Sequence, residues 1–157
     1  MQTTAIQHLY KPSNDGSSLF YAWLLSMHTR VDIILCSRKS EGELLLVVNR
    51  IYDALCRLEK MANFYNPASE LSVANRTAFV SPIVLSEELY SMIDLCLEYN
   101  SRTLGCFDVT VHSENYNQNT IHSVHLSAGD HSICFSQPGV TINLSGFLKG
   151  YALETIR

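Results

Sequence analysis

The chain of 157 residues is long enough to form one domain with its own hydrophobic core. Its 46% hydrophobic and 17% charged residues are typical of a globular protein and exclude a disordered chain. A net charge of −4 without any basic run argues against a nucleic-acid-binding surface, so we expect no nucleic-acid partner.

The five cysteines are odd in number, form no C-x-x-C pair and mostly lie inside apolar runs, where a free thiol behaves as a small hydrophobic group. We therefore expect reduced thiols and a reducing compartment. We find no signal-peptide pattern and no early cysteine for lipidation, and the longest apolar stretch, Leu19 to Met27, is too short to span a bilayer. We expect a soluble, cytoplasmic chain without a membrane segment.

The first part of the chain predicts an irregular segment followed by β structure. Residues 1–18 are polar and end in a loop rich in turn-forming residues. Leu19 to Met27 and Arg30 to Ser37 are rich in β-formers, and the second run alternates with a period near two, so strands are predicted for both. Met27-His28-Thr29 is either a tight link between them or a bulge in one long strand.

A long helix is predicted over residues 41–62, where apolar side chains recur at helical spacing. Ser40 can cap its first turn, and Glu41 and Glu43 suit the positive end of the helix dipole.

The stretch from Asn63 to Asn75 follows this helix. Asn66-Pro67 ends the helix, because a residue before proline is pushed out of the helical region. Tyr65 is then expected at the mouth of the packed structure, and Ser69 can cap a new turn. An aromatic ring among short polar side chains could hold a planar polar ligand. The alternative is an ordinary loop rich in turn formers.

The second half predicts another helix and several short strands. Phe79 to Leu85 is extended, and a helix should run from a cap at Ser86 to about Arg102, ended by Thr103-Leu104-Gly105. The remaining predicted strands are Phe107 to Val111, Ile121 to Leu126, Ser132 to Ser136 and Val140 to Leu144. A last helix should begin at Phe147 and continue to Arg157, so we expect the fold to be incomplete at its C-terminus.

These elements predict the α+β class, with two long helices packed on a mostly antiparallel sheet. We expect residues 1–18 to be an irregular segment and residues 19–157 to form the domain. The six histidines show no metal-ligand spacing, so a zinc site is not expected.

Two further clusters carry polar chemistry. In Thr103 to Thr110, Gly105 permits a close backbone approach, Phe107 can stack and Asp108 can accept hydrogen bonds; a helix end followed by a strand is the alternative. In Asn143 to Tyr151, a glycine loop opens a helix beside Lys149, which would favour a phosphate. The alternative there is a capped helix with a surface lysine.

The order and spacing of the clusters resemble the N-terminal half of the flavin transferase family (FAD:protein FMN transferase, also called thiamine biosynthesis lipoprotein ApbE). That family carries M-G-T near its first strands, S-x-Y-x-x-x-S-E-L-S-x-x-N after a helix, T-x-G-A-F-D-x-T after a second helix, and D-L-G-G-x-x-K-G-Y at the start of a third. The counterparts here are Met27-His28-Thr29, Asn63 to Asn75, Thr103 to Thr110 and Asn143 to Tyr151. The resemblance covers about residues 20–157.

This resemblance implies an ApbE-like, T-fold-like core and an enzyme that requires Mg²⁺, cleaves FAD, attaches FMN to a threonine or serine of a target flavoprotein and releases AMP. The residues that would line the FAD site are Met27, Tyr65, Ser69, Cys106, Phe107, Asp108, Asn143 and Lys149. Gly146 would offer its backbone carbonyl to the metal. Members of the family are often periplasmic lipoproteins.

Departures from the family pattern include His28 for the glycine of M-G-T, Asn143 for an aspartate and, more mildly, Cys106 for an alanine. The family's second half, which supplies an aspartate and a threonine to the metal and a histidine-containing segment near the reacting phosphate, has no counterpart here. We therefore expect no FMN transfer by these 157 residues alone. The alternative function is a degenerate, non-catalytic module that binds a flavin or nucleotide or serves as a scaffold. Uncovered sheet edges also lead us to expect a homodimer.

Overall fold

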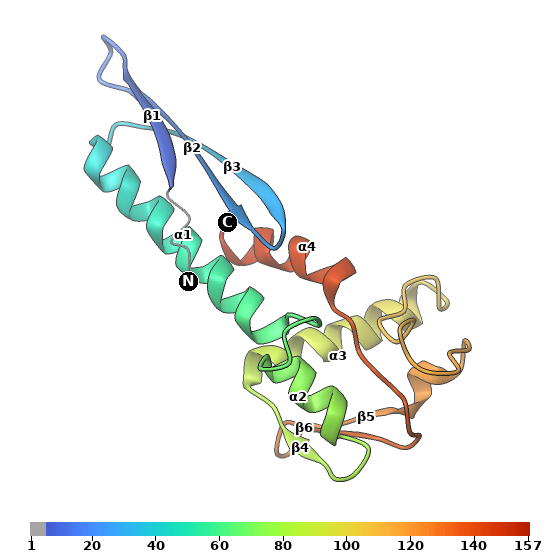
Figure 1. Ribbon diagram of the computed structural model, residues 1–157. Coiled ribbons are helices and arrows are strands. Elements are labelled where there is room, and N and C mark those ends of the chain that lie inside the picture. Colours follow the sequence, from blue (N-terminus) through green and yellow to red (C-terminus); the bar gives the residue numbers. More distant parts are fainter. Residues whose placement is uncertain (1–5) are drawn as a thin grey trace. The chain divides into compact units, whose positions relative to one another are not determined.

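The computed structural model describes residues 6–157, and the chain divides into two units (Figure 1). The first unit comprises Met1–Glu59, described from residue 6 onward, together with Ala152–Arg157. The second unit comprises Lys60–Tyr151 and contains most of the candidate site.

Three antiparallel strands form the sheet of the first unit: β1 (Gln7–Pro12), β2 (Ser18–Ser26) and β3 (Thr29–Ser37), in that order across the sheet. The alternation predicted for β3 is confirmed. Strand β2 alternates as well. The side chains that it turns to the buried face are Ser18, Phe20, Ala22, Leu24 and Ser26. Long helix α1 runs beside this sheet (Figure 1).

A two-residue turn joins β2 to β3, so the predicted tight link is confirmed and the bulge is not. Met27 (φ 50°) and His28 (φ 56°) both take the left-handed conformation, which the primed hairpin turns require. That conformation is unfavourable for residues with a Cβ. The Glu59 carboxylate offsets part of this cost, because it accepts hydrogen bonds from the Met27 N–H (2.9 Å) and the Ser26 hydroxyl (3.3 Å).

Helix α1 spans Glu41–Ala62, the range that the periodicity predicts. Ser40 and Glu43 form a reciprocal capping box: the Ser40 N–H and hydroxyl donate to the Glu43 carboxylate, and the Glu43 N–H donates back to the hydroxyl. These bonds, the backbone one first, lower the pKa of Glu43 below its ordinary value. The side chains of α1 that are buried are Leu44, Val48, Leu55, Leu58 and Ala62.

The expectation that residues 1–18 are irregular is wrong where β1 forms; residues 1–5 lie outside the described part. The alternation in β1 is short, because only His8 and Tyr10 turn inward. The His8 ring stacks on Phe20 at 4.9 Å, and a histidine in this role carries no apolar signal in the sequence. Where the domain begins stays a prediction.

The second unit contains a sheet of three antiparallel strands in the order β4-β6-β5. Its elements in chain order are α2 (Glu70–Thr77), β4 (Ile83–Val84), α3 (Glu87–Arg102), the 3₁₀ turn η1 (Thr120–Ser123), β5 (Val124–Ser127), β6 (Ser132–Phe135) and the beginning of α4 (Ser145–Thr155). The predicted α3 is confirmed, with its N-terminal cap at Ser86. The expected α+β class is confirmed too, although the strands form two sheets rather than one.

Several local predictions are wrong. Phe107 to Val111 forms turns instead of a strand, and Val140 to Leu144 is extended but belongs to no sheet. The strand expected at Ile121 to Leu126 begins as the turn η1. Helix α4 begins at Ser145 and ends at Thr155, before the last residues. Helix α2 occupies the end of the stretch expected to be a loop, because Ser69 caps it by accepting from the Ser72 N–H.

Leu55 tests the packing of α1, because its side chain is only 3% exposed. We expect Leu55→Ala to lower the free energy of unfolding by about 2–5 kcal/mol, since it leaves a cavity in the core. Leu46→Ala, in the same helix at a side chain 62% exposed, is the control and should change it by about 0.5 kcal/mol or less. Equilibrium denaturation measures both, and equal losses would contradict the assigned burial.

Candidate functional site

The extended segment Val140–Leu144 lies where the three sequence clusters meet within the second unit. Its main contact is with Asn75, whose side-chain oxygen accepts from the Ile142 N–H while its NH₂ donates to the Ile142 carbonyl, both at 2.9 Å. The Asn75 amide thus satisfies the peptide groups of Ile142 as a neighbouring strand would. It ties the first cluster to the segment that leads into the third.

The second cluster is tied to the same segment. The Asn143 N–H donates to the Val109 carbonyl at 2.8 Å. The Ser113 hydroxyl accepts from the Thr141 N–H at 2.9 Å and donates to the Thr141 carbonyl at 3.2 Å. Side chains far apart in sequence therefore replace the sheet partner that this segment lacks.

Within the first cluster, Ser69 is 1% exposed and holds the loop together. Its hydroxyl donates to the Asn63 carbonyl (2.6 Å) and accepts from the Ser72 N–H (3.1 Å). Its hydrogen bonds therefore lie inside the loop, and it would serve a ligand by shaping that loop. Tyr65, by contrast, is 72% exposed, as expected for a residue at a mouth.

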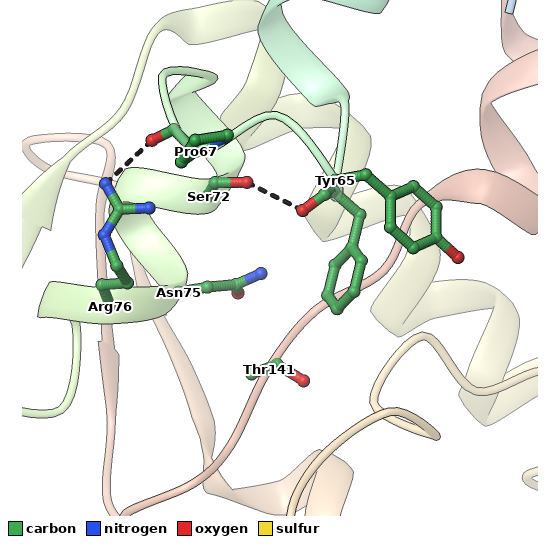
Figure 2. Close-up of a pocket in the computed structure, with 7 residues that line it drawn as sticks. Tyr65, Pro67, Ser72, Asn75, Arg76 and Thr141 are labelled. Carbon is green, nitrogen blue, oxygen red and sulfur yellow. Dashed lines mark hydrogen bonds between the residues drawn. The ribbon is translucent and has the colours of Figure 1, made fainter.

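A pocket of about 220 Å³ opens at this loop. The residues that line it are Phe64, Tyr65, Pro67, Ser72, Asn75, Arg76 and Thr141 (Figure 2). Figure 2 shows the Tyr65 ring on the side away from Arg76, whose guanidinium donates to the Pro67 carbonyl at 2.9 Å. The buried Thr141 hydroxyl, in a residue that lines the pocket, has no hydrogen-bond partner among the described residues.

The second cluster is a folded turn. The Asp108 carboxylate accepts from the N–H (2.7 Å) and hydroxyl (2.6 Å) of Thr110 and from the Tyr116 hydroxyl (3.1 Å). Burial, and then this bond to Asp108, raise the pKa of Tyr116 above its ordinary value. Phe107 is half-buried, with its ring edge-on to Tyr99.

Cys106, next to this turn, is exposed. Gly105 (φ 82°) follows α3 in the left-handed conformation that glycine adopts without strain. Its N–H donates to the Asn100 carbonyl at 2.9 Å, which closes the end of the helix as the sequence predicts.

The third cluster opens α4. Asn143 is 7% exposed, and its side-chain oxygen accepts from the Ser145 N–H at 2.9 Å. Gly146 and Lys149 are exposed in the first part of the helix. Six predicted site residues of the three clusters, together with Gly146 and Lys149, thus lie in one unit; Met27 lies in the hairpin turn of the other.

The described residues supply no group of three His, Cys, Asp or Glu side chains that could hold a metal. Gly146 contributes only a backbone carbonyl in the first turn of α4, at the positive end of the helix dipole. A magnesium ion bound at Gly146 would therefore need ligands in addition to this carbonyl. Residues 6–157 also include no helix that is long and apolar enough to cross a membrane.

The pattern of the ApbE family matches residues 27–157, which is most of the sequence. The chain belongs to the ApbE family. The match begins at Met27, the first residue of the first of the four motif segments described above.

Curated relatives of this ApbE-family chain include two proteins named FAD:protein FMN transferase. The one from Chlamydia muridarum is 27% identical over 130 residues, which cover 69% of this chain and 40% of the relative. The one from Chlamydia pneumoniae is 25% identical over 141 residues, which cover 76% of this chain and 44% of the relative. The chain therefore spans less than half the length of these relatives.

Solved structures share the fold. The ApbE protein of Thermotoga maritima superposes with a TM-score of 0.72 at 20% identity, over 97% of this chain and 51% of that one. The flavin transferase ApbE of Vibrio cholerae gives 0.64 at 15% identity, over 98% of this chain and 52% of that one. The predicted ApbE-like fold is thus confirmed, over about half the length of these structures.

The structure brings three residues to the clusters that were not predicted as site residues: Arg76, His112 and Thr141. His112 approaches Asn143, with 3.4 Å between its Nδ1 and the side-chain nitrogen, and its ring lies 5.5 Å from that of Phe64. None of the three lies inside one of the four motif segments. Each lies within two residues of a cluster, but the residue types there carry no motif signal of their own.

A substitution of Asn75 tests how strongly its side chain holds the segment Val140–Leu144. Asn75→Asp keeps the oxygen for the Ile142 N–H but places a second acceptor against the Ile142 carbonyl, so we expect the free energy of unfolding to fall by about 1–3 kcal/mol. Asn49→Asp is the control, because the Asn49 side chain donates only to a carbonyl of its own exposed helix turn. Urea unfolding of both variants checks this, and an equal, small loss from each would mean that the Asn75 bonds are dispensable.

Proposed function

We propose that this chain forms the FAD-binding part of a FAD:protein FMN transferase, an enzyme that transfers FMN from FAD to a threonine or serine of a target protein. The observation that carries the proposal is the convergence of three family motifs on the segment Val140–Leu144, within residues that match the ApbE family. The names of the Chlamydia relatives supply the substrate and the reaction.

The chemistry of the clustered residues suits a flavin nucleotide. Phe64 and Tyr65 offer aromatic surface, with ring centroids 5.2 Å apart in an edge-to-face arrangement, to a planar ring. The Thr141 hydroxyl and the side chains around it can bond to the edge of such a ring. The N–H groups at the N-terminus of helix α4 favour a bound anion, and Lys149 adds a positive charge on the same helix. Both would suit the phosphates of FAD.

The pocket volume limits how much of the ligand these walls enclose. A pocket of about 220 Å³ is smaller than the roughly 300–1,000 Å³ usual for a drug-sized ligand, so it would take one ring of FAD rather than the whole dinucleotide. The rest of FAD would extend over the exposed residues of the second and third clusters, including Cys106. The proposed Mg²⁺ would need ligands other than the Gly146 carbonyl.

The presence of an asparagine at position 143 favours the second candidate, a non-catalytic flavin- or nucleotide-binding module. The family pattern has an aspartate at this position, and a neutral amide cannot supply the same negative charge. In this alternative, FAD binds as described but no FMN is transferred to any acceptor.

Tyr65 tests the ligand site. If FAD stacks at this mouth, Tyr65→Ala should weaken FAD binding by roughly 1–3 kcal/mol and leave the unfolding transition nearly unchanged, because Tyr65 is 72% exposed. Phe79→Ala, which removes another exposed aromatic ring of the second unit from outside the pocket, is the control. Flavin fluorescence titration beside a denaturant melt separates the two effects. Unchanged FAD affinity together with a lowered melt would show that Tyr65 is a packing residue.

The transfer reaction has its own test. We expect incubation of the 157-residue chain with FAD, Mg²⁺ and a threonine-containing acceptor protein to give no covalent FMN adduct by mass spectrometry, because the described residues hold no metal cluster. The Vibrio cholerae relative serves as the active control. An adduct formed by the chain alone would contradict this expectation and exclude the non-catalytic candidate.

A further inference from the structure

The orientation of the Asn143 side chain is fixed by its surroundings. One end of the amide faces the Ser145 N–H at 2.9 Å, and because a backbone N–H only donates, that end must be the oxygen. The other end is therefore the NH₂ group, which only donates. It faces His112 Nδ1 at 3.4 Å, so Nδ1 must act as the acceptor.

An imidazole whose Nδ1 accepts a hydrogen bond carries its proton on Nε2 when the ring is neutral. The ring itself is well held. The backbone on either side of His112 is tied to the extended segment through the Val109 carbonyl and the Ser113 hydroxyl. Phe64 lies against the ring at 5.5 Å with an interplanar angle of 54°. His112 is nevertheless exposed, so a ligand can reach it.

We infer that Asn143 holds His112 as the Nε2–H tautomer, and that this N–H is a further donor to a phosphate oxygen of the bound flavin nucleotide. The ligand half of this inference rests on the proposed function; the tautomer half does not. Asn143 acts here as a positioning residue, and His112 as the group that contacts the ligand. Asn143 also accepts from the Ser145 N–H at the start of α4, and a helix N-terminus favours negative charge.

The amide at position 143 matters for this role because the family's aspartate would reverse it. A carboxylate has no proton to donate to Nδ1, so it would draw the ring proton to Nδ1 and leave Nε2 as an acceptor. An acceptor would repel a phosphate oxygen. Asn143 and His112 therefore work as a pair, in which the loss of the acidic side chain allows the histidine to bind the anion.

The tautomer is tested by ¹⁵N-edited NMR of histidine-labelled protein without ligand, at a pH where His112 is neutral. We expect the His112 signals of the wild type to show a protonated Nε2 and an unprotonated Nδ1. Asn143→Asp keeps the oxygen that accepts from Ser145, so the start of α4 is retained, and it should move the proton from Nε2 to Nδ1. The Nε2–H form is also common in free histidine, so this switch is the decisive result. A wild-type Nδ1–H signal, or an Asn143→Asp variant in which Nε2 stays protonated, would overturn the inference.

The ligand contact is tested by titrating FAD, FMN and riboflavin against two variants of His112. His112→Leu should weaken FAD and FMN about tenfold, the loss of one hydrogen bond to a charged group, and should leave riboflavin, which has no phosphate, unchanged. His112→Gln keeps an N–H donor and should lose less. Equal weakening of riboflavin would place His112 against the flavin ring and overturn the phosphate contact.

Asn143 is linked to this contact by a double-mutant cycle. Asn143→Asp should also weaken FAD, and His112→Leu should add little to it, because both changes remove the same donor. Full additivity would overturn the pairing. If the wild type binds no flavin at all, the proposed function and the ligand half both fail, whereas the NMR result decides the tautomer independently.

Discussion

The second unit depends on the pair of hydrogen bonds between the Asn75 side chain and the peptide of Ile142. A buried extended segment without a sheet partner would leave its N–H and C=O groups unsatisfied, at a cost of about 1–3 kcal/mol for each group. Asn75, Ser113 and the Val109 carbonyl satisfy these groups from three directions. The polar residues that solve this structural problem also belong to, or lie beside, the clusters from which the candidate site is built.

This arrangement explains how structural and ligand-binding roles are divided among the motif residues. The side chains of Ser69 and Asp108 form hydrogen bonds to residues of their own loops, so they fix the shape of the backbone there. Tyr65, Cys106 and Lys149 are exposed and retain surface for a ligand. The motifs of this chain therefore combine residues that fix the backbone around Val140–Leu144 with exposed residues that a ligand could contact.

The sequence predicts elements whose signals are local. The periodicity and capping box of α1 lie within one segment, as does the hairpin of β2 and β3, and both were predicted correctly. Phe107 to Val111 alternates as a strand would, but the Asp108 carboxylate takes the Thr110 N–H and turns the chain. Val140 to Leu144 is extended as predicted, whereas its hydrogen-bond partners lie up to 67 positions away, and alternation carries no information about such partners. The contacts of His112 with Asn143 and Phe64 could not be predicted for the same reason, because both residues lie far from it in the sequence.

The Met27–His28 turn has a consequence for how the chain folds. It joins two strands that pair over nine consecutive positions, from Ser26 opposite Thr29 to Ser18 opposite Ser37. All of these contacts are local in sequence, and hairpins of this kind form within about 1–10 μs. During synthesis from the N-terminus, the hairpin can close before the residues of the second unit exist. The hairpin that holds Met27, a candidate site residue, can thus become ordered before the three clusters of the second unit.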